Sequence, residues 1–509
     1  MRRALSLLIL VSALPATGWA GQGLESARVP GLDPSRRTMT ALKMGDGEQV
    51  VLDGRLDEAF WGRAVPASNF MQQDPSNGQP ATEPTEVRIV YNADSLFMGV
   101  TCFDSDPDGW LGYQRRRDEF LSADDRFQWV IDTYLDARSS YFFETNPSGL
   151  MADALRGTGT NNRQWDGIWN ERVRRSEIGW TVEIEIPFRT LNFDPASDTW
   201  GINFQRTIRR KNEETLWSGW ARNQGLNRLT NAGLVTGLEG ASQGHGVDLK
   251  PYGVSTWQSS PGRGDSSVTN DRSAGIDVAY SPTPRLRTNL TINTDFAQTE
   301  VDQRLTNLTR FPLFFQERRD FFLDGSTFFD FQSAGQNANS NSLIPFFSRR
   351  VGLDATNNPQ KIDVGGRVAG QAGGQDIGVL YVRTAEDDAS PGEDFLVLRA
   401  KRRVLRQSYV GALYTGRNAR ETEGGRMLNT VGADFVLATS TFRGSKNLSV
   451  GGFFLNTTNP ADTGKSSAFG ANVDYPNDLW DARISYREVQ KNYNAAVGFT
   501  PRTGFRRVN

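Results

Sequence analysis

Cysteine and histidine are almost absent from this sequence, which has one of each, Cys102 and His245, in 509 residues. A single cysteine excludes a disulfide within the chain, although large β proteins can be exported without one. A single histidine excludes a zinc site built from several histidines, and a histidine-containing catalytic triad would have to use His245. Much metal and hydrolytic chemistry is therefore excluded before any motif is considered.

Excess charge and long apolar runs are also missing. The formal net charge is −2, so the composition does not indicate a nucleic-acid partner. Beyond the N-terminus, no segment has the roughly 18 continuous apolar residues that a membrane-spanning helix needs. The 51 glycines and the 11% aromatic residues are instead typical of many strands joined by turns.

Residues 1–20 have the pattern of a secretory signal peptide. Arg2 and Arg3 precede an apolar run from Leu5 to Leu14, and small residues around Ala20 suit a cleavage site. The apolar run is too short to span a membrane. We therefore expect an exported protein whose residues 21–43 form a polar lead-in.

Residues 44–240 are predicted to form a β-sandwich. The stretch Gly179–Phe188 shows the clearest alternation, with apolar residues such as Trp180 and Val182 on one face and Glu183 and Glu185 on the other. Similar short strands with turn residues between them recur across the region, as expected for two packed sheets.

Seven stretches of this region match, in order, the pattern of a known module: Leu52–Trp61, Val87–Asp104, Asp124–Asp136, Phe143–Ala154, Trp165–Trp169, Gly179–Phe193 and Trp200–Ser218. Together they resemble the carbohydrate-binding module of family nine. The resemblance implies a β-sandwich that binds a glycan or oligosaccharide and often carries structural calcium.

After a small-residue hinge at Ala241–Gly246, residues 247–509 are predicted to form about a dozen antiparallel strands. Alternate positions are apolar in several of them, and the intervening residues are small or polar: Val410, Ala412 and Tyr414; Ala433, Phe435 and Leu437; Ala482, Ile484 and Tyr486. This repeat is typical of an outer-membrane β-barrel with lipid outside and water inside. A soluble sandwich gives a similar alternation, and that alternative stays open.

A phenylalanine-rich segment at residues 293–331 interrupts the strands. Phe311, Phe314, Phe315 and Phe322 approximate a helical stripe that Gly325 would end. The segment is expected to lie inside or beneath the barrel, and the alternative is a loop whose rings fill a core. Its charged residues Glu317, Arg318, Arg319 and Asp320, with Arg349 and Arg350 downstream, either line a lumen or pin the segment to the barrel wall, and pinning is favoured.

This segment also carries a second resemblance, on the following residues: Asp295-Phe296, Glu300, Asp302, Asn307-Leu308-Thr309, Phe314-Phe315, Glu317, Arg319, Phe321-Phe322-Leu323, Gly325 and Ser348–Gly352. It is similar to outer-membrane proteins that join a family-nine-like module to a large β-barrel domain of unknown function. Such barrels usually end on a strand with a terminal aromatic residue, whereas this sequence ends Gly504–Asn509. An incomplete barrel is therefore expected, unless the count of about a dozen strands is wrong.

The residues expected to bind sugar are aromatic rings with nearby amide, carboxylate and guanidinium groups. They are Trp165, Trp169, Asn203, Arg206, Trp217 and Trp220. Tryptophans that only close the ends of the sandwich are the alternative interpretation. A calcium site, the one candidate cofactor, is expected at Asp104, Asp106, Asp124 and Asp125, because calcium takes oxygen ligands. Solvated acidic turns are the alternative there.

The function predicted is that of an outer-membrane protein whose module binds glycans and whose barrel anchors or passes them. Its expected partners are glycan and outer-membrane lipid, with no nucleic acid. An exported hydrolase of glycosidic bonds is the first alternative, but Glu183 and Glu185 lie about 7 Å apart on one strand. They project in parallel and cannot easily flank such a bond, so solvent exposure is the favoured interpretation. A structural envelope protein without a ligand is the second alternative.

Overall fold

The computed structural model describes residues 36–157, 161–243, 247–261, 266–283, 285–294, 306–308, 312–332, 342–353, 360–386, 391–420, 427–458 and 464–509. The predicted signal peptide, His245 and part of the phenylalanine-rich motif (Asp295, Phe296, Glu300, Asp302, Thr309 and Phe311) lie outside these residues. Among the described residues, no helix is long and apolar enough to cross a membrane.

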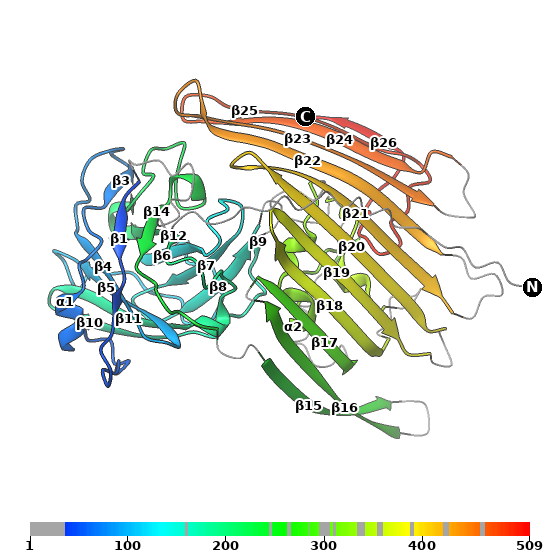
Figure 1. The fold of residues 1–509 in the computed structure, drawn as a ribbon, viewed down its shortest axis with the longest axis horizontal. Helices are drawn as coiled ribbons and strands as arrows, with labels where there is room; N and C mark the ends of the chain where they lie inside the picture. The colour runs from blue at the N-terminus through cyan, green and yellow to red at the C-terminus, as the bar shows by residue number, and fades with distance from the viewer. Residues whose placement is uncertain are drawn as a thin grey trace, which may run out of the picture. The chain divides into compact units, whose positions relative to one another are not determined.

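The N-terminal domain consists of two sheets that share one core (Figure 1). The nine-stranded sheet contains β1 (Thr38–Thr40), β3 (Met71–Asp74), β6 (Arg126–Asp132), β7 (Ser140–Thr145), β8 (Met151–Arg156), β9 (Asn161–Asn162), β12 (Trp200–Ile208), β13 (Glu213–Leu216) and β14 (Gly233–Thr236). The five-stranded sheet contains β2 (Leu42–Lys43), β4 (Thr85–Tyr91), β5 (Ser95–Phe103), β10 (Asn170–Ser176) and β11 (Gly179–Pro187).

The sandwich core forms where apolar side chains of both sheets meet. Val100 and Val182 come from the smaller sheet, and Trp129, Phe143 and Phe204 come from the larger one. The short helix α1 (Ala59–Arg63) adds two buried rings in a smaller cluster. The alternation along each strand thus places one face of each sheet in a shared interior, as predicted for a β-sandwich.

The sandwich begins earlier than the sequence suggested. The expected polar lead-in at residues 21–43 includes β1, which pairs in parallel with β14, and β2, which pairs in parallel with β4. Met39 and Ala41 are buried in the core. The sequence pattern did not indicate β1 and β2, because each is a very short strand with few apolar residues. The strands that pair with them lie far along the chain.

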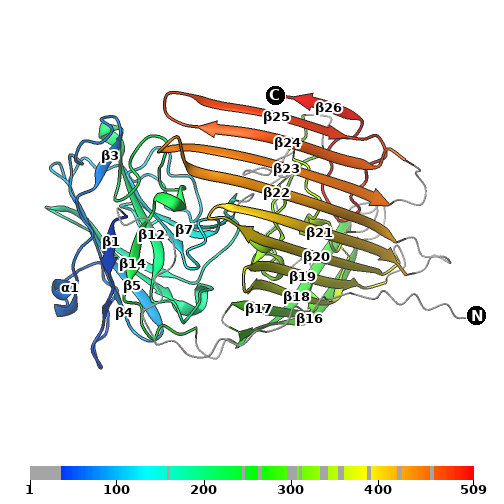
Figure 2. The same cartoon turned by 45° about the horizontal axis from the view of Figure 1, so that its top comes forward.

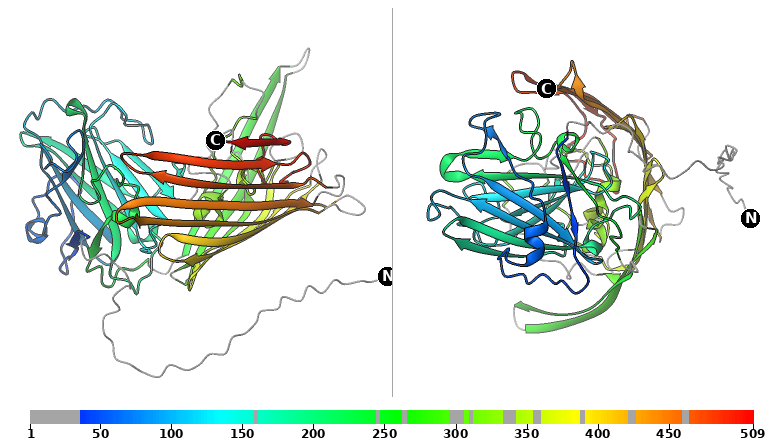
Figure 3. Two further views of the ribbon diagram at one scale, coloured as in Figure 1. Left: turned by 90° about the horizontal axis from the view of Figure 1, so that it is seen from above. Right: turned by 60° about the vertical axis from the view of Figure 1, so that its left-hand side comes forward.

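The C-terminal domain is one curved antiparallel sheet of twelve strands in sequence order (Figures 2 and 3). The strands are β15 (Val247–Pro261), β16 (Ser266–Thr283), β17 (Leu286–Thr294), β18 (Ile362–Ala372), β19 (Gln375–Thr384), β20 (Glu393–Val404), β21 (Ser408–Ala419), β22 (Leu428–Phe442), β23 (Lys446–Thr458), β24 (Ser467–Pro476), β25 (Asp481–Val489) and β26 (Phe505–Val508). No pairing joins β15 to β26 among the described residues, so the sheet is not closed. The predicted all-β class, with a sandwich before an incomplete antiparallel barrel-like sheet, is confirmed.

Strand β20 shows how the two faces of this sheet differ. Arg399 and Lys401 are buried on the inner face, where Phe395 and Val397 are buried beside them. Leu398, on the opposite face, is 40% exposed. The other apolar residues singled out in the sequence lie on that outer face as well, since the strand register pairs Val410 with Phe435 and Ala412 with Ala433.

The phenylalanine-rich segment packs against the inner face. In the described part of the segment the α-helix is limited to α2 (Asp320–Leu323), and residues 312–319 are not helical, so the predicted longer helical stripe is wrong. Gly325 follows α2 with a φ of 65°. Phe329 and Phe331 belong to a core cluster with Val397 and Leu413 of the sheet. The described part of the segment therefore lies against the sheet, and its rings fill a core there, which agrees with both interpretations given above. A short 3-10 helix at Ser326–Phe329 belongs to the segment, and another at Ser348–Arg350 follows it in the chain.

The charged residues of the segment serve structural roles. Arg319 donates to both carboxylate oxygens of Glu317, at 2.9 and 2.8 Å, and to the carbonyls of Ser348 and Val351, both at 2.9 Å. These contacts tie the segment to the chain around Ser348–Val351. Contact with the sheet is made by Asp320, which accepts from Lys250 of β15 at 3.0 Å, and by Asp324, whose carboxylate accepts from Arg287 at 2.7 Å.

Gly378 on β19 lets a ring approach the inner face. A Cβ at this position would lie 2.8 Å from the ring of Phe329, whereas a Cβ at Gly374 would meet nothing within 4 Å. We expect Gly378→Ala to reduce the free energy of unfolding by about 1–3 kcal/mol, the usual range for overpacking. Gly374→Ala is the matched control. Thermal unfolding of the full chain in detergent measures the difference, and equal melting temperatures would contradict this packing.

Candidate functional site in the β-sandwich

The tryptophans predicted to bind sugar lie mostly in the core. Trp165, Trp169 and Trp217 are only 8%, 3% and 3% exposed. The ring of Trp169 packs edge-on against Trp129, with centroids 5.6 Å apart. These three rings cannot stack on a sugar from solvent in this arrangement, which corrects that expectation and favours the alternative interpretation. The cause is that β-sandwich ends need large side chains to exclude water from the core.

Asn203 and Arg206 are buried as well. The Asn203 amide donates to the carbonyl of Ser218 at 2.9 Å and accepts from its N–H at 3.0 Å. Arg206 donates to the carbonyl of Pro84 at 2.9 Å. Both side chains therefore satisfy backbone groups inside the fold, and the expected sugar contact is corrected for them too.

Trp220 is the one predicted residue that stays half-buried at the surface. The guanidinium of Arg37 lies over its ring at 4.8 Å from the centroid. The six predicted residues consequently do not form one binding face.

The predicted calcium ligands accept hydrogen bonds from protein groups. Arg210 donates to both oxygens of Asp104, one of them at 2.8 Å. Asp124 accepts from the N–H of Gln114 and from the Asn146 amide, both at 2.9 Å. Asp125 accepts from the N–H of Leu111 at 3.2 Å, and burial raises its pKa. Asp106 lies 3.8 Å from Arg210.

Within the described ranges, these four carboxylates are not among the groups of three or more that lie close enough to share one ion. Arginine and backbone N–H groups supply the positive charge that calcium would supply. Calcium binding itself stays a prediction.

A different set of carboxylates does come together, and we call it the acid cluster: Asp118, Asp153 and Asp166. Asp153 lies on β8, and the other two lie in loops before β6 and after β9. One oxygen from each lies within 4.8 Å of the others. Arg117 lies among them, with Nε 3.0 Å from Asp166 and 3.6 Å from Asp118, and with Nη2 hydrogen-bonded to Asp153.

Asp153 is the buried member of the acid cluster. The indole N–H of Trp169 donates to it at 2.8 Å, and the N–H of Gly167 donates at 3.2 Å. Burial nevertheless raises the pKa of Asp153 to about 7, and burial also raises the pKa of Asp118. The buried tryptophan therefore positions a carboxylate that titrates near neutral pH.

An exposed ring lies next to the acid cluster. Phe120 is 70% exposed, and the guanidinium of Arg163 lies 4.9 Å from its centroid. Arg163 also donates to the carbonyl of Asp118 at 3.4 Å. Asn161 and Asn162 on β9 lie just before Arg163 in the chain. An aromatic face beside carboxylates, amides and a guanidinium is the combination that recognises the CH surface and the hydroxyls of a sugar.

Sequence reasoning did not select Arg117, Asp118, Phe120 or Asp153 as site residues. A signal existed, because Asp153 and Asp166 stand in two of the seven motif stretches named above. Those stretches are close in space only because β8 and the following loops fold onto each other.

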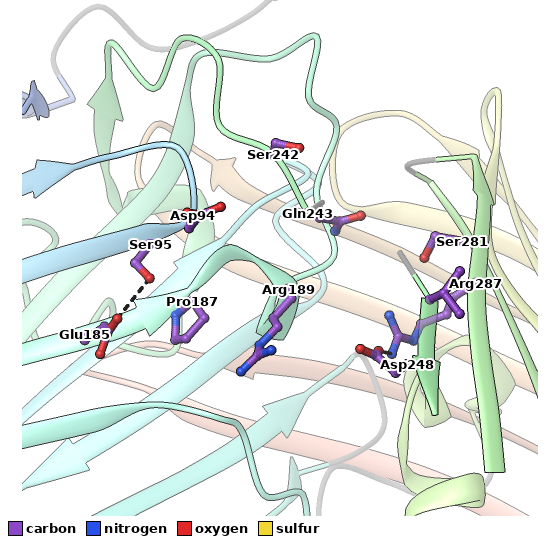
Figure 4. Close-up of a pocket in the computed structure, with 11 residues that line it drawn as sticks. Asp94, Ser95, Glu185, Pro187, Arg189, Ser242, Gln243, Asp248, Ser281 and Arg287 are labelled. Carbon is purple, nitrogen blue, oxygen red and sulfur yellow. Dashed lines mark hydrogen bonds and ion pairs between the residues drawn. The ribbon is translucent and has the colours of Figure 1, made fainter. Parts of the chain in front are cut away.

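The two glutamates of β11 do not form a catalytic pair. Glu183 is fully buried, which corrects the expected solvent exposure. It accepts from the N–H groups of Asp53 and Gly54 at 2.9 and 2.8 Å, and burial raises its pKa to about 7. Glu185 accepts from the hydroxyl of Ser95 at 3.1 Å (Figure 4). The buried Glu183 anchors the loop before α1 and does not face a cleft.

Polar side chains also gather around the linker between the two domains (Figure 4). Arg287 donates to Asp248 at 2.6 Å and to Asp324 at 2.7 Å. These charges are thus already paired, and the acid cluster with Phe120 remains the stronger candidate site.

Residues 247–370 match a family described as a domain of unknown function (DUF5916). The chain covers 95% of a family-nine carbohydrate-binding module from Caldicellulosiruptor kristjanssonii in complex with cellotriose, over 40% of its own length, at 13% identity and a TM-score of 0.30. It covers 99% of a carbohydrate-binding protein from Bacteroides uniformis, over 40% of its own length, at 14% identity and a TM-score of 0.31. It also covers 82% of Acinetobacter baumannii OccAB3, over 72% of its own length, at 8% identity and a TM-score of 0.25. No curated protein matches the sequence.

Asp153 should make stability depend on pH. Its pKa is about 7 in the folded chain and about 3.9 when unfolded, so between these values only the folded state holds the proton. Stability conferred by this group is therefore full below about pH 4 and is lost as the pH rises through 7. We expect Asp153→Asn to flatten the fall in melting temperature of the full chain between pH 5 and 8.

Burial also raises the pKa values of Glu171 and Glu183, to about 8 and 7. These two groups should therefore keep part of the dependence of the melting temperature on pH in the Asp153→Asn variant. Asn162→Ala is the non-titrating control and should keep the original slope. A slope that Asp153→Asn leaves unchanged would contradict the role of this carboxylate.

Proposed function

We propose that this chain is an exported outer-membrane protein whose twelve-stranded sheet lies in lipid and whose sandwich binds glycans. The observation that carries the membrane assignment is the reversed polarity of the sheet. Charged side chains such as Arg399 and Asp434 are wholly buried on the inner face, while apolar side chains are exposed on the outer face. A water-soluble sheet would carry the opposite arrangement.

Exposed apolar residues occur on most strands of the sheet: Leu249, Leu290, Ile292, Val364, Leu398, Val410, Val431, Leu437, Phe454, Val473 and Ile484. The strand register places several of them side by side, for example Ile292 with Val364 and Val473 with Ile484. Such a continuous apolar face is costly in water and stabilising against lipid chains. The lengths of β18 to β25, 9 to 15 residues, suit tilted strands that cross a bilayer.

The sandwich is proposed to capture a glycan or oligosaccharide at the acid cluster and Phe120. Asp166 is 64% exposed there, and a carboxylate beside an exposed aromatic ring can accept hydrogen bonds from sugar hydroxyls. The expected signal peptide accounts for export. The lipid-facing sheet would then anchor the module, or pass its ligand, at the cell envelope.

A charge at the middle of β20 tests the membrane assignment. Leu398→Arg should reduce the free energy of unfolding in phospholipid vesicles by about 2–4 kcal/mol, the cost of an arginine on the lipid face near the bilayer centre. Val51→Arg, at an exposed sandwich position, should cost much less. The urea midpoint of the full chain measures both. Equal effects, or a chain that stays soluble and monomeric without detergent, would overturn the assignment.

Phe120→Ala tests glycan capture. Loss of a stacking ring should weaken binding about five- to tenfold, measured by calorimetry with the best ligand found on a glycan array. Val65→Ala removes another exposed apolar side chain and should leave affinity unchanged. Trp165→Ala should instead lower the melting temperature, because that ring is buried. The absence of any retained sugar would reject the proposal.

A further inference from the structure

A group of exposed arginines lies on the same loop as Asp118 of the acid cluster, on its N-terminal side. The loop between β5 and β6 continues from Trp110 through exposed Tyr113, Arg115 and Arg116. Arg175, at the end of β10, joins them. We call Trp110, Tyr113, Arg115, Arg116 and Arg175 the basic patch.

Contacts around Arg175 hold this loop in place. Its guanidinium lies 3.7 Å from the centroid of the Trp110 ring. It donates to the carbonyl of Pro147 at 2.9 Å and to the hydroxyl of Ser148 at 3.2 Å. Ser148 in turn donates to the carbonyl of Gly112 at 2.7 Å. The aromatic and basic groups therefore belong to one preorganised surface rather than to a freely moving loop.

The charges of the patch are only partly neutralised by the described part of the chain. Arg115 makes no hydrogen bond or ion pair in the part of the chain that the structure describes, and it is exposed. Burial, together with the positive charge of Arg115, lowers the pKa of Arg175, so the two guanidinium groups lie close enough to repel. Arg116 has Glu119 at 3.7 Å, an exposed pair that contributes little. The carboxylates of the neighbouring acid cluster already pair with Arg117.

We propose that the basic patch binds the oxyanions of an acidic saccharide, a glycan with carboxylate or phosphate groups along its chain. Guanidinium groups form paired hydrogen bonds with such oxyanions. An anion between Arg115 and Arg175 would relieve their repulsion. A saccharide is favoured over a small anion because the Tyr113 ring is exposed in the patch. Asp118 of the acid cluster also follows on the same loop, and the cluster can accept hydrogen bonds from hydroxyls. The proposal rests on the proposed glycan binding and specifies its ligand class.

The test measures binding of the full chain in detergent to four probes: an oligouronate, a neutral glucan oligosaccharide of equal length, a phosphorylated oligosaccharide and inorganic phosphate. At low salt, the charged oligosaccharides should bind at least tenfold more tightly than the neutral one. The preference should shrink as salt screens the arginines. Whichever charged oligosaccharide binds more tightly identifies carboxylate or phosphate as the natural oxyanion.

Arg115→Gln is the decisive variant, because this side chain contacts nothing that the fold needs. It should remove most of the preference for charged oligosaccharides, and Arg115→Gln with Arg175→Gln should abolish it. Arg55→Gln, an exposed arginine elsewhere on the sandwich, should leave it unchanged. If the neutral oligosaccharide binds as tightly as the charged ones, and its binding depends on Phe120, this inference is overturned while the glycan proposal stands. No binding of any oligosaccharide would overturn the glycan proposal as well. Equal binding of inorganic phosphate would show an anion site without saccharide selectivity and overturn the inference.

Discussion

The twelve-stranded sheet depends on the pairing of charges on its inner face. Arg399 donates to both oxygens of Asp434 at 2.7 and 2.8 Å, and both side chains are wholly buried. Tyr409 and the N–H of Gln332 complete the contacts of Asp434, each at 3.0 Å. A buried charge without such partners would cost several kcal/mol. The pair therefore requires β20, β22 and the phenylalanine-rich segment to be assembled together.

The same constraint explains why the inner face carries both charge and phenylalanine. Arg399 also donates to the carbonyl of Asp330, 2.9 Å away. The rings of Phe329 and Phe331 fill the space between these polar contacts. An outer face with exposed apolar side chains on most strands would be costly in water. This cost connects the pairing inside the sheet with the lipid proposed outside it.

In the sandwich, buried carboxylates again organise the structure, and the exposed loops around them carry the recognition chemistry. Glu183 holds the loop before α1, and Asp153 positions Trp169 and Arg117. Arg117 ties the loop from Trp110 to Phe120 to Asp153. It presents guanidinium groups at one end and an aromatic ring with carboxylates at the other. This division between a rigid support and exposed polar groups is typical of binding sites built on β-sandwich scaffolds.

Strand alternation in the sequence was sufficient to predict the all-β class, the sandwich, about a dozen later strands and which side chains of those strands share a face. These properties are local, because successive side chains of a strand point to opposite sides whatever the strand packs against. The alternation did not reveal which tryptophans point inward: Trp165 and Trp217 are buried because other strands cover them. Nor did it reveal the acid cluster, since Asp118, Asp153 and Asp166 meet only when three separate stretches fold together. Contacts between residues distant in the chain depend on how sheets and loops pack, and no short-range pattern records that packing.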